Sequence, residues 1–177
     1  MPIWIVYVLA GIGLFIMFGG VLAVLAISGV RKYIANAKMA EARNVVTEIG
    51  RDAVTAYEAG APRRLCPSAS RSVPDSVLMV SGKKYQSSPS EWEVDKATNA
   101  GFACLKFSMT SPHYYSYTYR AHGASAPGDG FEAIANGDLA GNGVISHVKL
   151  TGQIGADGNL ALAPRLIEET PDGRYTE

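Results

Sequence analysis

Charge is missing from the first 30 residues of this 177-residue chain, although the whole sequence holds 16 acidic and 16 basic side chains. Their balance gives a net charge of zero, so a general electrostatic attraction to nucleic acid is not expected. Hydrophobic residues make up 47% of the chain, a share that excludes an intrinsically disordered protein. The uneven distribution of charge predicts an apolar N-terminal segment joined to a polar remainder.

The sequence also lacks the residue patterns that mark common catalytic and cofactor sites. Its three histidines, His113, His122 and His147, stand far apart, and no pair of histidines or cysteines has the spacing of a zinc site. The Gly-x-Ser-x-Gly pattern and the glycine patterns of phosphate and dinucleotide sites are absent. We therefore expect no enzyme activity, no catalytic residue, no metal and no cofactor.

One loop has an incomplete similarity to a calcium site. Residues 136–146 read Asn-Gly-Asp-Leu-Ala-Gly-Asn-Gly-Val-Ile-Ser, which gives Asp138 the first ligand position. However, Ala140 takes the third position, and Lys149 takes the twelfth, where a bidentate glutamate belongs. A tight turn into a strand explains the same residues, and we favour the turn.

Residues 3–29 form an uncharged apolar run, and about 20 such residues are enough for a helix to cross a membrane. Trp4 and Tyr7 stand where one interface would lie, and Arg31 and Lys32 mark the other. The alternative is a cleaved secretory signal, which begins with basic residues and has a shorter apolar core. We expect a single-pass membrane segment at residues 3–29.

Two further features give conflicting indications of where the polar part lies. Arg31, Lys32 and Lys38 follow the apolar run closely, and the positive-inside rule would place the remainder in the cytoplasm. Cys66 and Cys104 indicate the opposite, because a disulfide is the expected state of such a pair outside the reducing cytosol. A bridge would stabilise the domain by about 4 kcal/mol, and two buried free thiols are the alternative.

The apolar run is expected to continue as one helix to residue 59. Proline is absent from residues 30–59, and Gly60 and Pro62 then provide a stop signal. After Lys38, apolar and small side chains recur every three or four residues, which predicts a stripe along one side of the helix. The stripe consists of Met39, Ala42, Val46, Ile49, Ala53, Ala56 and Tyr57.

Beyond residue 60 the sequence predicts an irregular region and then an antiparallel sheet. Residues 61–100 are rich in serine and proline, with a short strand at 77–80 and Trp92 as a buried plug over the sheet. The connections between later strands are too short for parallel crossovers. Strands are expected at 102–109, 115–119, 131–135 and 144–151, followed by a hairpin of 153–154 with 160–162 around Asp157-Gly158.

These elements predict an α+β fold in which a long N-terminal helix packs on a four- to five-stranded antiparallel sheet. The first half of the helix is expected to span a membrane. The expected parts of the chain are 1–30 (membrane or filament-core half of the helix), 31–60 (amphipathic half) and 61–177 (connecting region and β domain).

Three tyrosines, Tyr115, Tyr117 and Tyr119, alternate along one expected strand. Such a row packs in the core in most proteins, but exposed rings would stack on nucleotides or sugars. We favour the core and keep ligand-facing aromatics as the alternative.

Residues 30–44, Val-Arg-Lys-Tyr-Ile-Ala-Asn-Ala-Lys-Met-Ala-Glu-Ala-Arg-Asn, together with the apolar run before them, resemble the first helix of type IV pilins. The portion Ala-Lys-x-Ala-Glu-Ala-Arg-Asn, residues 37–44, is similar to pilin-like proteins of myxobacteria and their relatives. The resemblance implies a pilin-like fold, retention in the inner membrane before assembly, and polymerisation into a cell-surface filament by a pilus assembly machinery. The N-terminal helices would then be bundled at the centre of the filament.

The chain departs from the pilin pattern in two respects. Pilins are cut after a glycine that follows a basic leader, and they carry a glutamate at the fifth position of the mature chain. Cleavage after Gly11 or Gly13 would put Ile16 or Phe18 at that position, and no acid precedes Glu41.

The leading hypothesis is therefore a structural subunit that forms a homo-oligomeric, type IV pilus-like filament through its apolar helix. The alternative is a single-pass, membrane-anchored periplasmic binding module that does not polymerise. Small residues allow helices to approach closely. The residues expected at the helix contacts are Gly11, Gly13, Gly19, Gly20, Gly29, Met39, Ala42, Val46, Ile49 and Ala53.

Overall fold

The structure of the chain is a computed structural model that describes residues 2–169. Inside the first helix, the side chains of residues 5, 6, 8–10, 12, 23–29, 31, 32 and 35 are not described. The chain divides into two units, Met1–Ala37 and Lys38–Glu177.

The longest element, α1, runs over the 57 residues Ile3–Ala59. Its residues after 37 belong to the second unit. The helix ends where Gly60 donates its amide hydrogen to the carbonyl of Tyr57, at 3.3 Å. Pro62 follows, and its ring cannot continue a helix.

The structure contradicts the predicted membrane segment at residues 3–29. A crossing requires an unbroken apolar helix of about 20 residues. Among the described residues, no helix provides an apolar stretch of that length. The predicted fold class, a pilin-like fold with a membrane-spanning first half of the helix, is therefore wrong in this respect. The predicted localisation, in an inner membrane before assembly and at the cell surface afterwards, is wrong for the same reason. The prediction rested on the composition of residues 3–29, which was not sufficient evidence for a membrane-spanning helix.

The second unit is an α+β structure with one five-stranded sheet. Its strands are β1 (Ser116–His122), β2 (Gly130–Gly137), β3 (Ser146–Ile154), β4 (Leu160–Leu162) and β5 (Ile167–Glu169). All neighbours pair antiparallel in the order β1-β2-β3, and the short strands β4 and β5 both pair with β3. The predicted antiparallel sheet of four to five strands is confirmed, including the hairpin that joins β3 to β4.

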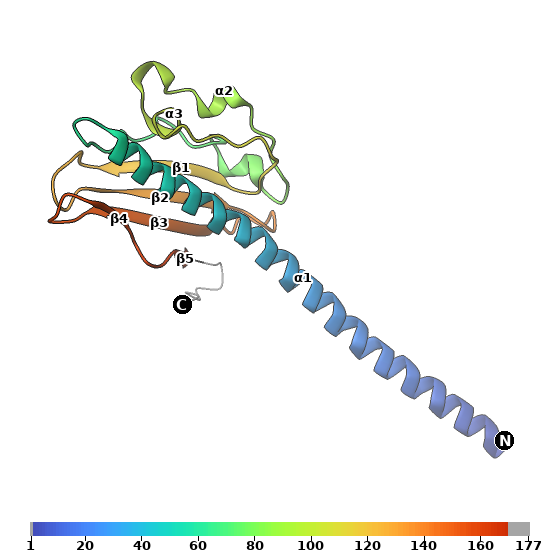
Figure 1. Cartoon of the computed structure of the whole chain (residues 1–177). Helices are drawn as coiled ribbons and strands as arrows, with labels where there is room; N and C mark the ends of the chain where they lie inside the picture. The colour runs from blue at the N-terminus through green and yellow to red at the C-terminus, as the bar shows by residue number, and fades with distance from the viewer. Residues whose placement is uncertain (1, 170–177) are drawn as a thin grey trace. The chain divides into compact units, whose positions relative to one another are not determined.

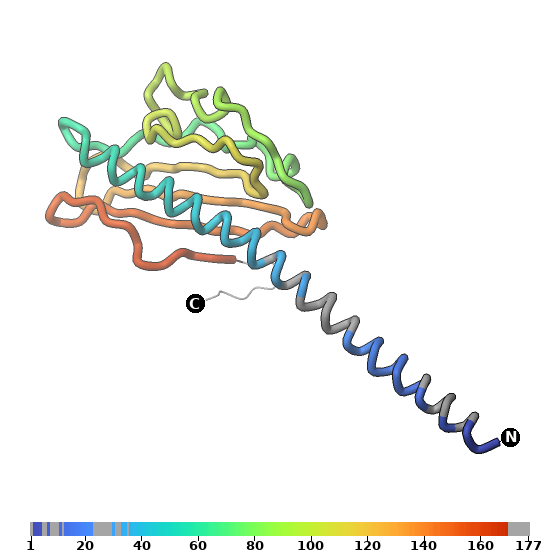
Figure 2. The backbone as a smooth tube through the Cα atoms, turned by 45° about the vertical axis from the view of Figure 1, so that its right-hand side comes forward, coloured from blue at the N-terminus to red at the C-terminus, as the bar shows by residue number. Residues whose placement is uncertain are grey.

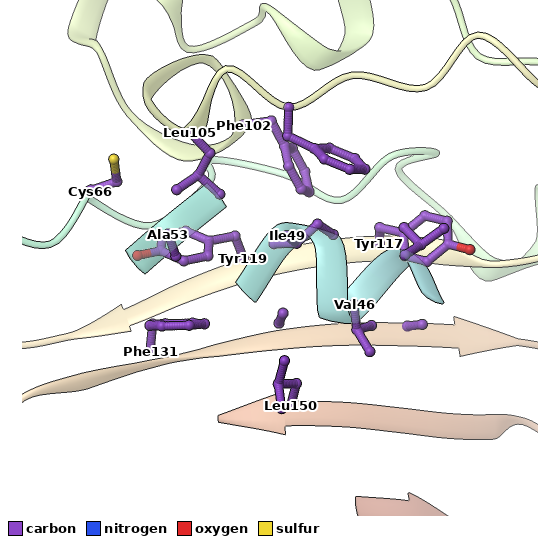
Figure 3. Close-up of a cluster of buried hydrophobic side chains, with 14 of the residues drawn as sticks. Val46, Ile49, Ala53, Cys66, Phe102, Leu105, Tyr117, Tyr119, Phe131 and Leu150 are labelled. Carbon is purple, nitrogen blue, oxygen red and sulfur yellow. The ribbon is translucent and has the colours of Figure 1, made fainter. Parts of the chain in front are cut away.

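The core lies between one face of this sheet and the later turns of α1 (Figure 1). Val46, Ile49 and Ala53 of the predicted stripe are buried in this core, in the cluster drawn in Figure 3. A Cβ on Gly50 would lie 2.6 Å from a methyl carbon of Leu150, so a larger residue there would require the Leu150 side chain to shift. The buried residues on the sheet side are Tyr117, Tyr119, Phe131, Ala133, Ala135, Val148 and Leu150.

Residues 61–115 gather along the β1 edge of the sheet (Figure 2). Val73 and Tyr117 exchange two backbone hydrogen bonds of 2.9 Å, and the amide of Ala69 donates to the carbonyl of Tyr119 at 2.9 Å. The segment therefore covers the polar edge of β1, which would otherwise be open to pairing with another chain.

Two predicted strands in this region are short helices instead. Residues 77–80 form η1 (Val77–Val80), and the expected strand at 102–109 begins with α3 (Gly101–Leu105). Phe102 and Leu105 are three residues apart, a spacing that puts both on one face of a helical turn, and both side chains are buried. The remaining short elements are α2 (Pro89–Trp92) and η2 (Lys96–Thr98).

Trp92 is buried, as predicted for a plug. Its ring meets Phe102 and Phe107 edge to face, with centroids 4.9 Å and 5.2 Å apart. Its indole nitrogen donates to Ser87 Oγ at 2.9 Å, so the polar atom of this side chain is satisfied.

The predicted disulfide between Cys66 and Cys104 is confirmed, with Cα atoms 5.8 Å apart. The strand expected at 102–109 would have placed Cys104 on a strand, but Cys104 lies on the helix α3. The bridge thus fixes α3 to the segment that leaves α1.

Removal of this bridge should lower the stability of the second unit. We expect the double variant Cys66→Ala/Cys104→Ala to lose about 2–5 kcal/mol of unfolding free energy, because the unfolded chain is then no longer constrained. Urea unfolding followed by circular dichroism measures this loss. A reducing agent should bring the unmodified chain to the same midpoint and leave the variant unchanged; equal midpoints without reductant would contradict the prediction.

Candidate functional site

The first unit carries an apolar surface that nothing in this chain covers within the described residues. We call it the apolar helix surface. Phe15 is 80% exposed and Tyr33 is 75% exposed, which is unusual for large apolar side chains that follow one another along a helix. The described members are Ile3, Trp4, Tyr7, Leu14, Phe15, Ile16, Met17, Phe18, Val21, Leu22, Val30, Tyr33 and Ile34.

This surface surrounds the helix and is not a stripe. Residues 14–18 are consecutive, all apolar and all exposed. Each residue turns the helix by about 100°, so these five side chains point in every direction around the axis. A helix that is apolar on all sides is typically a helix that is buried when the protein works.

Four of the predicted packing glycines lie within this surface. At Gly11, Gly13, Gly19 and Gly20, a Cβ atom in place of the hydrogen would meet no other atom within 4 Å. These positions therefore leave the backbone open to close approach by another helix. The fifth, Gly29, lies outside the residues whose surroundings are described.

The other five predicted packing residues have a different partner. Ala42, Val46, Ile49 and Ala53 are buried, and Met39 is partly buried, all in the core between α1 and the sheet of the same chain. In this structure they hold the helix in its own domain and do not face another copy.

Polar contacts fix α1 to the second unit at the beginning of that packed region. Glu41 Oε1 accepts a hydrogen bond from the backbone nitrogen of Tyr114 at 2.7 Å and one from the Tyr117 hydroxyl at 3.3 Å. Arg43 forms a two-pronged ion pair with Glu168 of β5, with Nη2 2.7 Å from Oε2. The hydrogen bond from Arg43 to Glu168 raises the pKa of Arg43. We call Glu41, Arg43 and Glu168 the polar clasp.

Lys38 adds a third contact near the clasp. Its Nζ donates to the carbonyl of Leu139 at 2.9 Å and lies 4.6 Å from the centre of the Tyr114 ring. Lys38, Glu41 and Arg43 belong to the run of residues that resembles pilins. Here Glu41 and Arg43 attach the helix to β1 and β5, and Lys38 attaches it to the loop that follows β2.

The tyrosine row lies in the core. Tyr115, Tyr117 and Tyr119 are each 0% exposed, and burial raises the pKa of all three phenols. Their rings therefore offer no surface on which a nucleotide or sugar could stack. The alternative of ligand-facing aromatics is corrected, because α1 covers the face of the sheet on which the row lies.

In the loop that resembles a calcium site, the Asp138 carboxylate accepts hydrogen bonds from the loop's own backbone and from Ser81. Asp138 Oδ1 accepts from the amides of Gly141 and Asn142, and Oδ2 accepts from Gly143 and from Ser81 Oγ at 2.7 Å. The bond from Ser81 is the main cause that lowers the pKa of Asp138. Both carboxylate oxygens thus organise a tight turn, in agreement with the turn interpretation.

The sheet face away from α1 contains a depression of about 340 Å³, lined mostly by polar residues of β1, β2, β3 and β5, together with Ile134 and Ile167. Glu132 accepts a hydrogen bond from Lys149 at 3.0 Å, and one of its oxygens lies 3.6 Å from His122 Nε2. Burial alone would raise the pKa of Glu132, but these bonds and charges lower it. The acid at the centre of this face is therefore already paired within the fold.

His113 is a buried histidine for which sequence analysis gave no role. It is 0% exposed, and its Nδ1 donates to the carbonyl of Tyr115 at 2.7 Å. Its Nε2 has no hydrogen-bond partner among the described residues, and the rings of Tyr85, Trp92 and Tyr117 surround it. Burial lowers the pKa of His113, an effect that hydrogen bonding to Tyr115 and the charges of Glu41 and Glu91 only partly offset.

Sequence analysis missed the partners of the clasp as well. Arg43 and Glu168 are 125 positions apart, and no local pattern connects them. Only the pairing of β5 with β3 brings Glu168 beside α1.

His113 should make the stability of the second unit depend on pH. The folded state favours the neutral ring of His113. The contribution of His113 to the free energy of unfolding is therefore fully present above about pH 6.5, the ordinary histidine pKa, and is lost as the pH falls below that value. Denaturant unfolding between pH 8 and pH 5 (about these limits) measures the decline, whose slope reaches about 1.4 kcal/mol per pH unit for one proton.

The variant His113→Asn is the matched control. Its amide can donate to the Tyr115 carbonyl in place of Nδ1, but it does not titrate. We expect a lower stability at every pH and a flatter dependence below about pH 6.5. An unchanged slope in the variant would show that other groups cause the decline.

Comparisons with protein-family models, with curated proteins and with solved structures found no match to this chain. The resemblance to type IV pilins therefore remains a prediction from residues 30–44, and the function has to be argued from the surfaces described above.

Proposed function

We propose that this chain is a structural subunit that assembles with copies of itself through the apolar helix surface of the first unit. The observation that carries the proposal is the exposure of consecutive large apolar side chains at residues 14–18. Apolar area of this extent is unfavourable in water, so it calls for a partner that covers it.

The distribution of this surface favours several neighbours over a single one. One partner helix covers one side of α1 and leaves the side chains on the opposite side in water. Because residues 14–18 point in all directions, complete coverage needs helices on more than one side. A bundle of identical helices meets this need, since each copy brings the same apolar surface.

The glycines support close contacts inside such a bundle. Gly19 and Gly20 adjoin Phe18 and Val21 and have open space where a side chain would stand. Small residues allow helix backbones to approach, and large neighbours can then pack across the gap. The similarity of residues 30–44 to type IV pilins suggests the form of the assembly, a pilus-like filament with the helices at its centre.

The second unit has no comparable need of a partner. Its helix stripe is buried against its own sheet, its edge strand β1 is covered by residues 65–73, and its disulfide is closed. The two parts of α1 therefore have different tasks in this proposal. The first provides the assembly surface, and the second belongs to the core of the domain that each copy carries.

Photo-crosslinking tests the identity of the partner. A photoreactive residue replaces Phe18, which is 62% exposed on the apolar helix surface, and the control replaces Leu78, which is 80% exposed on η1. We expect the Phe18 probe to give a ladder of bands at multiples of 18.8 kDa, and the Leu78 probe to give far less. A single adduct of another mass would show that a different protein covers this surface and would contradict self-assembly.

Charge substitution tests the energetics of the same contact. An unpaired carboxylate inside an apolar bundle is strongly unfavourable, so Phe15→Glu/Phe18→Glu should weaken association by a factor of more than about 100. Sedimentation velocity of the full chain after removal of detergent measures the change, and Leu78→Glu is the control for an added charge at an exposed apolar site. The proposal fails if the unmodified chain sediments as a monomer, or if both substitutions have the same effect.

A binding module that does not polymerise is the other candidate, and the depression on the free sheet face is the surface that favours it. Monomeric behaviour in the sedimentation experiment would support this candidate.

A further inference from the structure

The disulfide lies beside a depression of about 400 Å³ between the last turns of α1 and α3. Asp52, Ala56 and Ala59 form its wall on α1, and Cys104 and Lys106 form its wall at α3. Pockets that hold small molecules begin at about 300 Å³, so this depression is large enough for a molecule of tripeptide size.

The two sulfur-bearing residues differ in their access to this depression. Cys104 is partly buried and lines it, whereas Cys66 is 5% exposed and belongs to the core. The chain around Cys66 is held on both sides, because the amide of Leu65 donates to Ala124 and the carbonyl of Pro67 accepts from Gly101. A reagent from solvent therefore meets Cys104 first.

Thiol–disulfide exchange depends on such access, because the thiolate must reach the sulfur that it attacks. We propose that Cys104 is a modification site at which a small-molecule thiol enters through this depression and forms a mixed disulfide. The thiolate sulfur bonds to Cys104 Sγ, the bond between Cys66 and Cys104 breaks, and its electron pair leaves with Cys66 Sγ as a thiolate, which takes a proton from water. A second thiol molecule then releases the Cys104 thiolate and leaves as the oxidised small-molecule disulfide.

The charges at the depression predict which thiols react faster. Asp52 is negative and stands on the α1 wall, and Lys106 stands across from it at the end of α3. Glutathione carries net negative charge, whereas cysteamine carries a positive amine. Removal of the Asp52 charge should therefore raise the rate of reaction with glutathione and should not raise the rate with cysteamine.

Peptide mapping tests the position of the adduct. The folded full chain reacts briefly with reduced glutathione, the reaction is stopped with acid, free thiols are alkylated, and a protease separates the Cys66 and Cys104 peptides for mass spectrometry. We expect glutathione on Cys104 and the alkylating label on Cys66. Glutathione on Cys66, or equal amounts on both cysteines, would overturn the proposal.

Two substitutions test the access route. Ala59→Phe fills the depression and should slow the formation of the mixed disulfide by a factor of about ten, because exchange rates depend on access. Asn44→Phe is the control, since Asn44 is exposed on α1 but does not line the depression. Equal rates in the two variants would contradict the route, provided that both show the circular dichroism spectrum of the unmodified chain.

The variant Asp52→Asn separates an effect of charge from an effect of a loosened fold, because it should change the reaction rates with the two thiols differently. The rate with glutathione should rise about threefold at low ionic strength and the rate with cysteamine should not rise, because one charge at the depression acts oppositely on the two thiols. A loosened fold would accelerate both reactions. Equal acceleration, or no change with either thiol, would contradict the proposed approach past Asp52.

Discussion

The second unit depends on one contact, the burial of one side of α1 against one face of the sheet. Ala42, Val46, Ile49 and Ala53 provide small and branched side chains on the helix, and aromatic and aliphatic residues of β1, β2 and β3 meet them. Gly50 lies against the Leu150 side chain, whose methyl carbon would have to move if position 50 carried a Cβ atom. The tyrosine row, the covering segment along β1 and the aromatic cluster around Trp92 are all arranged around this interface. Interiors of proteins are packed as densely as crystals, so each of these parts constrains the others.

One continuous helix thus serves two physical environments. After residue 38 its apolar side chains form a stripe, and the opposite side is polar and exposed, as at Asn44 and Glu48. Before residue 30 the described side chains are apolar on every side. A stripe needs one partner, which the sheet provides within the chain, whereas an apolar circumference needs several. This difference is the physical basis of the proposal that the first unit mediates assembly.

Polar groups decide how α1 is placed on the sheet. Apolar contacts are non-directional, so they alone would tolerate a shifted helix. The hydrogen bonds to Glu41 and the ion pair of Arg43 with Glu168 have fixed lengths and directions. Charge-assisted bonds of this kind are stronger than neutral ones, and the two-pronged geometry of arginine adds specificity. The disulfide has a related role at the other end of the packed helix, where it holds α3 beside the segment that leaves α1.

Elements with local signals could be predicted from the amino-acid sequence. These signals are the absence of proline from residues 30–59, the three- and four-residue spacing of the stripe, the alternation in residues 115–119 and 144–151, and the Asp157-Gly158 hairpin. All depend on near neighbours in the chain, although the strand predicted from residue 144 begins at Ser146. The pairing of Cys66 with Cys104 followed from their number. Short segments were predicted wrongly, because the alternation over residues 102–109 concealed the helical spacing of Phe102 and Leu105, and η1 had too few residues for any period to show. Composition over residues 3–29 also predicted a membrane segment that the described helix does not provide. Three features became visible only in the folded chain: the contact of Glu168 with Arg43, the burial of the tyrosine row under α1, and the position of Cys104, but not Cys66, at a depression. These features join residues distant in sequence, and their contacts arise from the packing of helix, sheet and covering segment together.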